Sequence, residues 1–252
     1  MLPRSSRLSS FSSLKTLVQK IGNYYCGQVC RREFLTQQFQ GFNERAVEYR
    51  FLFENLAQVC PKSLLDVGTG KTALPQLIRT FGPLVTAIDN VKDYWPKGMM
   101  NRHYHVVGND ILAPTIEGPF DFITCISTLE HIRDHQRAMR NMFSLLAPGG
   151  HMVITFPYTE REYVENVYAL PGSIGATTYS FPTQSFSRRE LDSWVRDNNG
   201  RILTQEYWRF FSGPYWTLGS RVVPPVKVSE SESHQLSCVL LEKVGSTTDS
   251  LA

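Results

Sequence analysis

The sequence of 252 residues contains no apolar run of the roughly 20 residues that a bilayer span requires. A marked excess of charge is also missing, because 26 Lys and Arg residues stand against 23 Asp and Glu residues, for a net charge of +3. That balance is too even to indicate a nucleic-acid partner. The apolar stretch of a secretory signal is absent too, so we expect a globular, cytoplasmic protein.

Cysteine is scarce and irregularly spaced, which argues against a disulfide framework. Cys125 and Cys238 lie inside apolar runs, where reduced core thiols are expected. His131 and His135 have the spacing of metal ligands on one helical face, but no third ligand is in view, so we expect no metal site. The five cysteines are Cys26, Cys30, Cys60, Cys125 and Cys238.

Acidic residues are nearly absent from residues 1–33, which hold six Lys or Arg residues, many serines and the single acid Glu33. The spacing of the apolar residues there predicts a helix with an apolar stripe. We expect residues 1–42 to form a basic helical extension that packs on the main domain or on a second subunit, as in a homodimer. The alternatives are a helix on a membrane surface and a transit segment. The stripe consists of Phe11, Leu14, Val18, Ile21 and Tyr25.

From residue 43 onward, apolar strand-like segments alternate with helical patterns. This alternation predicts an α/β fold with a mostly parallel sheet and helices on both faces. Residues 209–234 are expected to be loop-like, and residues 245–252 a flexible tail. The expected strands are 63–67, 84–89, 104–107, 120–127, 151–156, 201–208 and 235–242. The expected helices are 44–59, 72–80, 133–146, and one that a capping box at 187–190 opens and a left-handed Gly200 ends.

Residues 66–72 read DVGTGKT and form a glycine-rich turn between a strand and a helix. A P-loop would need glycine at position 65, where this chain has leucine. Gly68 and Gly70, with Asp89 about 20 residues later, fit the fingerprint of a dinucleotide site, which leaves an NAD-dependent oxidoreductase open. Asp66 argues against that ligand, because a carboxylate repels a pyrophosphate. The same carboxylate suits a cation such as the sulfonium or ammonium of S-adenosylmethionine.

Five segments in sequence order resemble the motifs of class I S-adenosylmethionine-dependent methyltransferases. The resemblance covers about residues 43–243 and implies a Rossmann-like sheet of seven strands, a domain at 43–244 and an enzyme that uses S-adenosylmethionine. Thr72 departs from the pattern, since many members have a third glycine there. The segments are DVGTG at 66–70, AIDN at 87–90, GNDIL at 108–112, FDFITCISTLEH at 120–131 and LAPGG at 146–150.

The resemblance implies roles for individual residues. Asp66 would face the ammonium of the methionine end, Asp89 would accept the ribose hydroxyls, and Asp110 would accept from the adenine amino group. The expected cofactor-binding residues are Asp66, Gly68, Thr69, Gly70, Asp89, Asn90, Asp110, Ile111, Ile126 and Ser127.

His131 is the leading candidate for a catalytic base, because an imidazole with a pKa near 6.5 can take a proton at neutral pH. Its alternative role is to cap a helix or line the cofactor site. Glu130 is a second catalytic candidate, and Tyr158 and Glu160 are lesser ones. A non-catalytic binding module that keeps the fold is a further alternative to the enzyme.

The acceptor is expected to be a small molecule, and the aromatic residues of 158–186 are expected to form a lid over it. The layout is similar to members of bacterial polysaccharide and secondary-metabolite pathways, which implies methylation of a hydroxyl on a sugar or small metabolite. The residues that carry this second resemblance are Glu44-Arg45-x-x-Glu48-Tyr49, the Ser-Thr-Leu-Glu-His turn and the lid segment.

Overall fold

The computed structural model describes residues 6–39, 41–95, 97–175 and 181–245. It divides into two compact units, Met1–Phe42 and Asn43–Ala252. The first unit consists of helix α1 (Ser6–Thr36) and the residues that follow it. Apart from Gly245, the expected tail 245–252 lies outside the described residues. None of the helices in the described part of the chain has the length and apolarity needed to cross a membrane.

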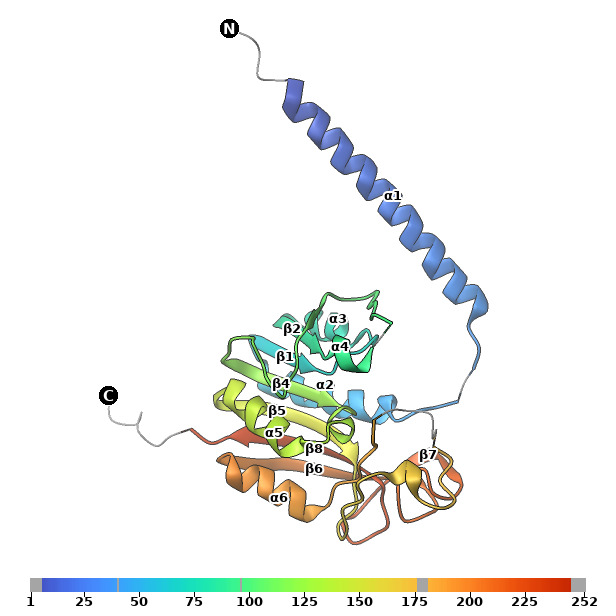
Figure 1. The fold of residues 1–252 in the computed structure, drawn as a ribbon, viewed down its shortest axis with the longest axis vertical. Coiled ribbons are helices and arrows are strands. Elements are labelled where there is room, and N and C mark those ends of the chain that lie inside the picture. The colour runs from blue at the N-terminus through green and yellow to red at the C-terminus, as the bar shows by residue number, and fades with distance from the viewer. Residues whose placement is uncertain (1–5, 40, 96, 176–180, 246–252) are drawn as a thin grey trace, which may run out of the picture. The chain divides into compact units, whose positions relative to one another are not determined.

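The second unit is built on one sheet of eight strands within the described residues, in the order β3-β2-β1-β4-β5-β8-β6-β7 (Figure 1). Strands β1 to β5 are parallel to one another, whereas β8 is antiparallel to β5 and to β6. The strands are β1 (Ser63–Val67), β2 (Leu84–Asp89), β3 (Val106–Gly108), β4 (Phe120–Ile126), β5 (Leu146–Pro157), β6 (Gly200–Phe211), β7 (Arg221–Val228) and β8 (Leu236–Lys243).

The expected α/β fold with a mostly parallel sheet is confirmed, but the sheet has eight strands rather than seven. The additional strand, β7, pairs antiparallel with β6 at one edge of the sheet. It lies inside the segment 209–234 that we expected to be loop-like. Pro224 and Pro225 interrupt its sequence pattern, which is why the sequence did not predict this strand. Because proline cannot donate a hydrogen bond to a neighbouring strand, β7 is compatible only with an edge position.

Side chains alternate along the central strands, and each face of the sheet buries a separate hydrophobic cluster. Leu65, Ile123 and Met152 point to the face that α5 (His135–Leu145) and α6 (Arg188–Asp197) cover. Their sequence neighbours Leu64, Phe122 and Val153 point to the face that α2 (Arg45–Val59) and α3 (Leu74–Arg79) cover. The period of two therefore produces the three layers of helix, sheet and helix that Figure 1 shows.

Two local details differ from the sequence expectations. Helix α6 opens with the predicted capping box of Ser187 and Glu190, but the left-handed residue after it is Asn199, with φ of 52°, not Gly200. Gly200 instead starts β6, where a Cβ would lie 2.8 Å from the ring of Phe143. Strand β5 begins earlier than expected and includes Gly149, which has φ of 74°.

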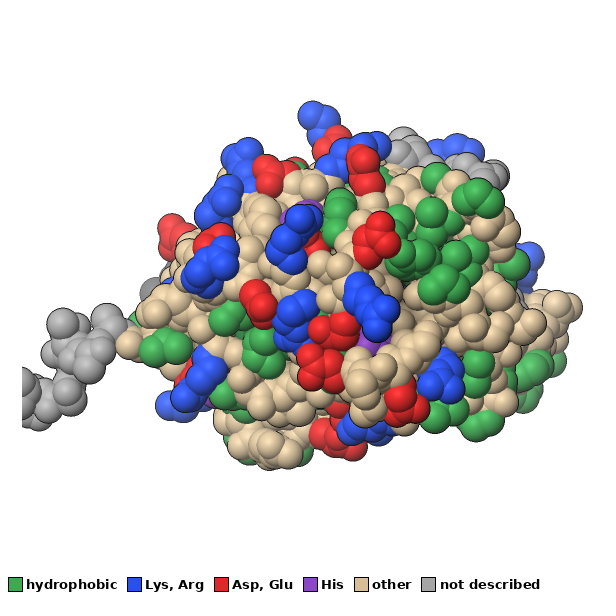
Figure 2. Space-filling view, turned by 90° about the horizontal axis from the view of Figure 1, so that it is seen from below, with side chains coloured by type: hydrophobic (Ala, Val, Ile, Leu, Met, Phe, Trp, Pro, Cys, Tyr) green, Lys and Arg blue, Asp and Glu red, His purple; other side chains and the backbone are tan. Residues whose placement is uncertain are grey.

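The described part of residues 158–186 is mostly irregular, with a short 3-10 helix at Val167–Ala169. Residues 176–180 of this expected lid lie outside the described residues. Figure 2 shows one face of the surface, on which lysine and arginine side chains are interspersed with aspartate and glutamate. That face therefore carries no extended patch of one charge.

Candidate functional site

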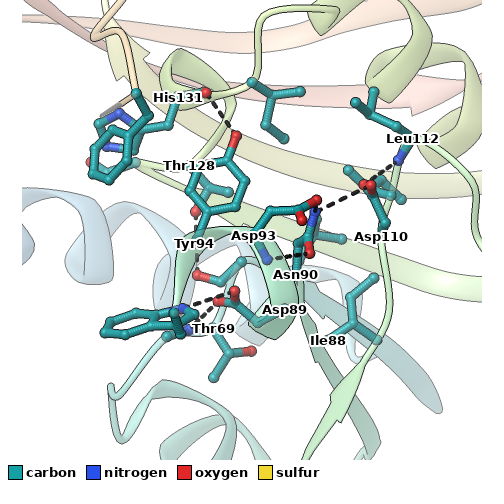
Figure 3. Close-up of a pocket in the computed structure, with 18 of the residues that line it drawn as sticks. Thr69, Ile88, Asp89, Asn90, Asp93, Tyr94, Asp110, Leu112, Thr128 and His131 are labelled. Atoms are coloured by element: carbon teal, nitrogen blue, oxygen red, sulfur yellow. Dashed lines mark hydrogen bonds between the residues drawn. The ribbon is translucent and has the colours of Figure 1, made fainter. Parts of the chain in front are cut away.

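A cavity of about 950 Å³ opens at the carboxyl ends of β1, β2, β3 and β4. This is the edge at which parallel α/β sheets bind their ligands, because the loops that follow the strands leave a crevice there. Figure 3 shows that the lining side chains come from the turns after these strands and point towards one another. The lining includes Arg45, Gly68 to Thr72, Asp89, Asn90, Asp93 to Trp95, Asn109 to Leu112, Ser127, Thr128, His131, Phe181 and Pro182.

The glycine turn between β1 and α3 forms one wall of this cavity. Gly68 and Gly70 have φ of 77° and 55°, conformations that side chains with a Cβ rarely adopt. At Gly68 a Cβ would also lie 2.1 Å from the methyl carbon of Thr128, in the turn after β4. The chain itself therefore requires glycine at position 68, in addition to any need of a ligand to approach the backbone.

Asp66 lies at the end of β1 and is 2% exposed. Its two carboxylate oxygens accept from the hydroxyls of Thr124, at 2.6 Å, and Thr69, at 2.7 Å. Burial raises the pKa of Asp66, and the two hydroxyls only partly offset that effect. Asp66 lines a small hollow beside the main cavity, together with Arg45 and Tyr49 of α2. A cationic ligand group near this desolvated carboxylate would stabilise its ionised form.

Asp89 ends β2 and already accepts two hydrogen bonds from its own chain. The backbone N–H of Gly70 donates to one carboxylate oxygen at 2.7 Å, and the indole N–H of Trp95 donates to the other at 3.1 Å. Burial raises the pKa of Asp89, and these two donors counteract the rise. The ammonium of Lys71 lies 4.8 Å from the Trp95 ring centre, so Trp95 links the glycine turn to the acid of β2.

Polar groups also follow β2 and β3, where Figure 3 shows Asn90 and Asp110 facing each other. The Asn90 amide donates to Asp110 at 3.2 Å and to Asp93 at 2.9 Å. Asp110 also accepts from the backbone N–H of Leu112 at 2.8 Å. Between these polar residues, Ile111 is buried and adds an apolar surface to the wall. This part of the cavity could hold a flat polar ring against an apolar floor.

His131 lies in the 3-10 turn Leu129–His131 after β4. Its Nδ1 is 3.0 Å from the carbonyl oxygen of Pro182, and its ring centre is 4.6 Å from that of Phe181. A carbonyl only accepts, so Nδ1 carries the proton and Nε2 has the lone pair. Burial lowers the pKa of His131, which favours the neutral imidazole. The arrangement suits a base, and the hydroxyl of Tyr94 further fixes this turn by donating to the His131 carbonyl at 3.0 Å.

Glu130 is 4% exposed and is not among the described residues that line the cavity. Its Oε1 is 4.0 Å from Nε2 of His131, and its Oε2 has no hydrogen-bond partner among the described residues. Burial raises its pKa to about 8, so the carboxyl is largely protonated at neutral pH. A neutral acid next to His131 can hold a proton, and the catalytic role of Glu130 stays a prediction.

Most of the expected cofactor residues meet at this cavity, although their roles stay predictions. Gly68, Thr69, Gly70, Asp89, Asn90, Asp110, Ile111 and Ser127 line the main cavity, whereas Asp66 and Ile126 line the small hollow beside it. His131 lines the main cavity as well, and Glu130 is not among the described residues that do. The lesser candidates Tyr158 and Glu160 are not among its lining residues either; Tyr158 is fully buried and donates to Glu160 at 2.9 Å.

Sequence reasoning missed three contributors. Arg45 lines both the main cavity and the hollow, Trp95 contacts Asp89, and Lys71 stacks on Trp95. The only sequence signal for Arg45 was its place in the Glu44–Tyr49 motif, which gave it no role. No spacing rule predicts a role for Trp95, because its contact with Asp89 depends on how the turn after β2 folds back on the glycine turn.

Comparisons with known proteins agree with this architecture. The sequence model of a family described as methyltransferase domain matches residues 32–205. A ubiquinone biosynthesis O-methyltransferase of Coxiella burnetii is 28% identical over 155 residues, which are 56% of this chain and 64% of that protein. The enzyme of the same name from Chromobacterium violaceum is 32% identical over 101 residues, or 37% of this chain and 44% of that protein. The matches thus cover less than two thirds of these relatives' lengths.

A solved structure has the same fold. It is the 1,6-didemethyltoxoflavin-N1-methyltransferase of Burkholderia thailandensis, crystallised with 1,6-didemethyltoxoflavin and S-adenosylhomocysteine. The TM-score is 0.53 at 16% identity, and the alignment covers 97% of this chain and 93% of that one. At this identity the likeness concerns the fold alone.

Proposed function

The chain belongs to the methyltransferase domain family, and on that premise we propose that it transfers a methyl group from S-adenosylmethionine to a hydroxyl of a small molecule. The observation that carries the proposal is the pair of buried acids, Asp66 and Asp89, at the ends of adjacent parallel strands beside a glycine turn. The reaction is proposed for a cytoplasmic enzyme. The five cysteines are free, in keeping with a reducing compartment.

The residues around the cavity support this proposal, because their chemistry suits each part of the cofactor. Asp66 would offer a desolvated carboxylate to the ammonium of the methionine end, and Arg45 would offer a guanidinium to its carboxylate. Asp89 would accept from the ribose, while Asn90, Asp110 and Ile111 would hold the adenine. When bound, the cofactor supplies an electrophilic methyl group on a cationic sulfur.

The acceptor would enter from the side of His131 and Phe181. The rings of Tyr94 and Phe181 lie 5.6 Å apart between centres with their planes tilted by 45°, and Tyr168 adds a third aromatic side chain to this wall. Such rings stack on a planar acceptor or on the face of a sugar. Orienting the acceptor oxygen in line with the methyl group can account for much of the rate, since orientation is worth about 7–11 kcal/mol.

His131 would take the proton of the acceptor hydroxyl through Nε2. The bond from Nδ1 to Pro182 fixes the required tautomer, and the lowered pKa keeps the base neutral at pH 7. Methylation of a hydroxyl agrees with the names of the matched relatives, which are O-methyltransferases. These relatives are similar to this chain only over part of their length.

The first test is a calorimetric titration of the protein with S-adenosylmethionine, S-adenosylhomocysteine and NAD. We expect the first two to bind and NAD not to bind. D89A should weaken S-adenosylhomocysteine by roughly 10- to 100-fold, because a hydrogen bond to a charged group contributes about 1.5–3 kcal/mol. D192N, at an exposed position of α6, is the matched control. Binding of NAD in place of the methyl donor would disprove the proposal.

The second test identifies the acceptor and its base. A panel of phenols, sugars and other hydroxylated metabolites is incubated with the methyl donor, and mass spectrometry detects the added methyl group. With an acceptor in hand, kcat/KM should rise with pH through a pKa below 6.5 and then level off. This limb should disappear in H131Q, which cannot act as a base. An unchanged pH profile in H131Q would show that His131 only lines the site.

A further inference from the structure

Glu48 is a fully buried carboxylate on the inner side of α2 that lies next to the site without lining it. It accepts hydrogen bonds from three elements. Arg45 of the same helix donates at 2.8 Å, Thr155 of β5 donates at 2.7 Å, and the hydroxyl of Ser127, after β4, donates as well. Two of these three donors, Arg45 and Ser127, line the cavity. Glu48 therefore connects two cavity residues by hydrogen bonds without lining the cavity itself.

Stability alone does not account for this carboxylate. Its neighbours on α2, Phe51 and Leu52, belong to the apolar cluster between α2 and the sheet. An apolar residue in the same place would avoid the desolvation of a charge, and replacing buried ion pairs by apolar groups is often neutral or stabilising. A fully satisfied polar network fixes the geometry of its members more tightly than apolar packing does. The geometry that Glu48 fixes is that of Arg45 and Ser127.

Ser127 has an unusual backbone conformation for a residue other than glycine, with φ of 43°. Its N–H donates to the backbone carbonyl of Thr155 at 3.1 Å and to the Thr155 hydroxyl at 3.0 Å. Residues held in this left-handed region cost about 1–3 kcal/mol and need surrounding contacts to persist. Glu48 accepts from the hydroxyls of both Ser127 and Thr155, and so fixes the start of the turn that continues to Thr128 and His131.

Arg45 gains both orientation and charge balance from Glu48. A guanidinium has five N–H donors, and the bond to Glu48 leaves donors for a second carboxylate. A lone guanidinium would also repel the positive charges of a bound methyl donor, and the negative charge of Glu48 compensates for this. The pair can thus bind a carboxylate beside a cation, which is the charge pattern of a methionine moiety.

We propose that Glu48 is a positioning residue that holds the Arg45 guanidinium for the carboxylate of the methionine end of the cofactor. The proposal rests on the proposed function, because it assumes that S-adenosylmethionine is the ligand. It predicts that Glu48 matters for ligands that contain the amino-acid end and not for ligands that contain only the nucleoside end.

The test compares two ligands by calorimetry: S-adenosylhomocysteine, and 5′-methylthioadenosine, which lacks the amino-acid end. In E48Q, which keeps the side-chain volume and removes the charge, Kd for S-adenosylhomocysteine should rise about 10-fold or more. Kd for 5′-methylthioadenosine should change less than about twofold. R45M should show the same pattern, and the double variant should be no worse than R45M, because the two residues act as one unit. E54Q, at an exposed position of the same helix, should change neither affinity.

Equal weakening of the two ligands in E48Q, or no weakening of either, would overturn the proposal and leave Glu48 with a structural role. If E48Q does not fold, E48D takes its place, because it keeps the charge but moves it away from Arg45; the same preferential loss is expected, and an equal loss overturns the proposal. Failure of the unmodified protein to bind S-adenosylhomocysteine would instead refute the proposed function.

Discussion

Glu130 combines deep burial with an oxygen that has no hydrogen-bond partner among the described residues, so its protonation must be linked to folding. Its pKa is about 8 in the folded chain, against 4.5 as the ordinary value. The unfolded chain therefore ionises Glu130 at a lower pH than the folded chain does. As pH rises from about 4.5 to 8, ionisation of Glu130 progressively lowers the unfolding free energy, and above about pH 8 this loss of stability is complete. The charged groups that act on it are Glu48 and Arg45 of α2 and Glu44, which immediately precedes that helix.

We predict that E130Q gains stability over the unmodified protein as pH rises. The amide stays neutral at every pH, so the difference in unfolding free energy should grow from pH 5 to pH 9, by about 5 kcal/mol at most. Urea denaturation at several pH values measures it. E117Q, at an exposed position, should show no such trend. A difference that stays constant with pH would mean that Glu130 has a polar partner in solution.

At the same scale, sequence reasoning found the residues that obey a spacing rule and missed those that act through tertiary contacts. Asp66 and Asp89 could be predicted because they occur near the ends of two strands, one of them beside a glycine turn. The structure places both beside the cavity or its hollow. Arg45, Trp95 and the bridging role of Glu48 depend on how α2 and the turn after β2 dock against the sheet. No local sequence pattern predicts how these segments dock against the sheet.

Helix α6 shows an element whose start can be read from its sequence. The Ser187 side chain caps the backbone of the third helical residue, and Glu190 accepts from the Ser187 N–H at 3.1 Å. We predict that S187A lowers the unfolding free energy by about 1 kcal/mol, within a range of about 0.5–2, because an N-terminal donor loses its partner. S187T keeps the hydroxyl and should restore most of this loss.

Thermal or urea unfolding measures this change, and affinity for S-adenosylhomocysteine provides the control, because neither Ser187 nor the residues of α6 line the cavity in the described chain. A fall in affinity in S187A at unchanged stability would contradict the assignment of a purely structural cap.

The elements that sequence reasoning placed well are those whose pattern is set by burial. Strands β1 and β2 have the expected bounds, because each is a short apolar run between turn residues. Strand β7 was missed because its burial is low and two prolines break its period. The cap at Asn199 was assigned to Gly200, because sequence alone does not tell which of two adjacent turn formers takes positive φ.

For the whole molecule, both hydrophobic clusters draw their members from Val47 onward within the described residues. We predict that a protein beginning at Asn43 folds with the same thermal midpoint as the full chain and binds S-adenosylhomocysteine equally well. Differential scanning calorimetry and calorimetric titration of both proteins test this. A midpoint lower by several degrees would show that residues 1–42 contribute to the packing of the domain.

The two edges of the sheet have a consequence for assembly. At one edge, β3 offers only three residues, and at the other, the adjacent prolines Pro224 and Pro225 remove two N–H groups from β7. A strand from another molecule would find few backbone groups to pair with on either side. The short β3 and the prolines of β7 therefore disfavour edge-to-edge aggregation of the sheet.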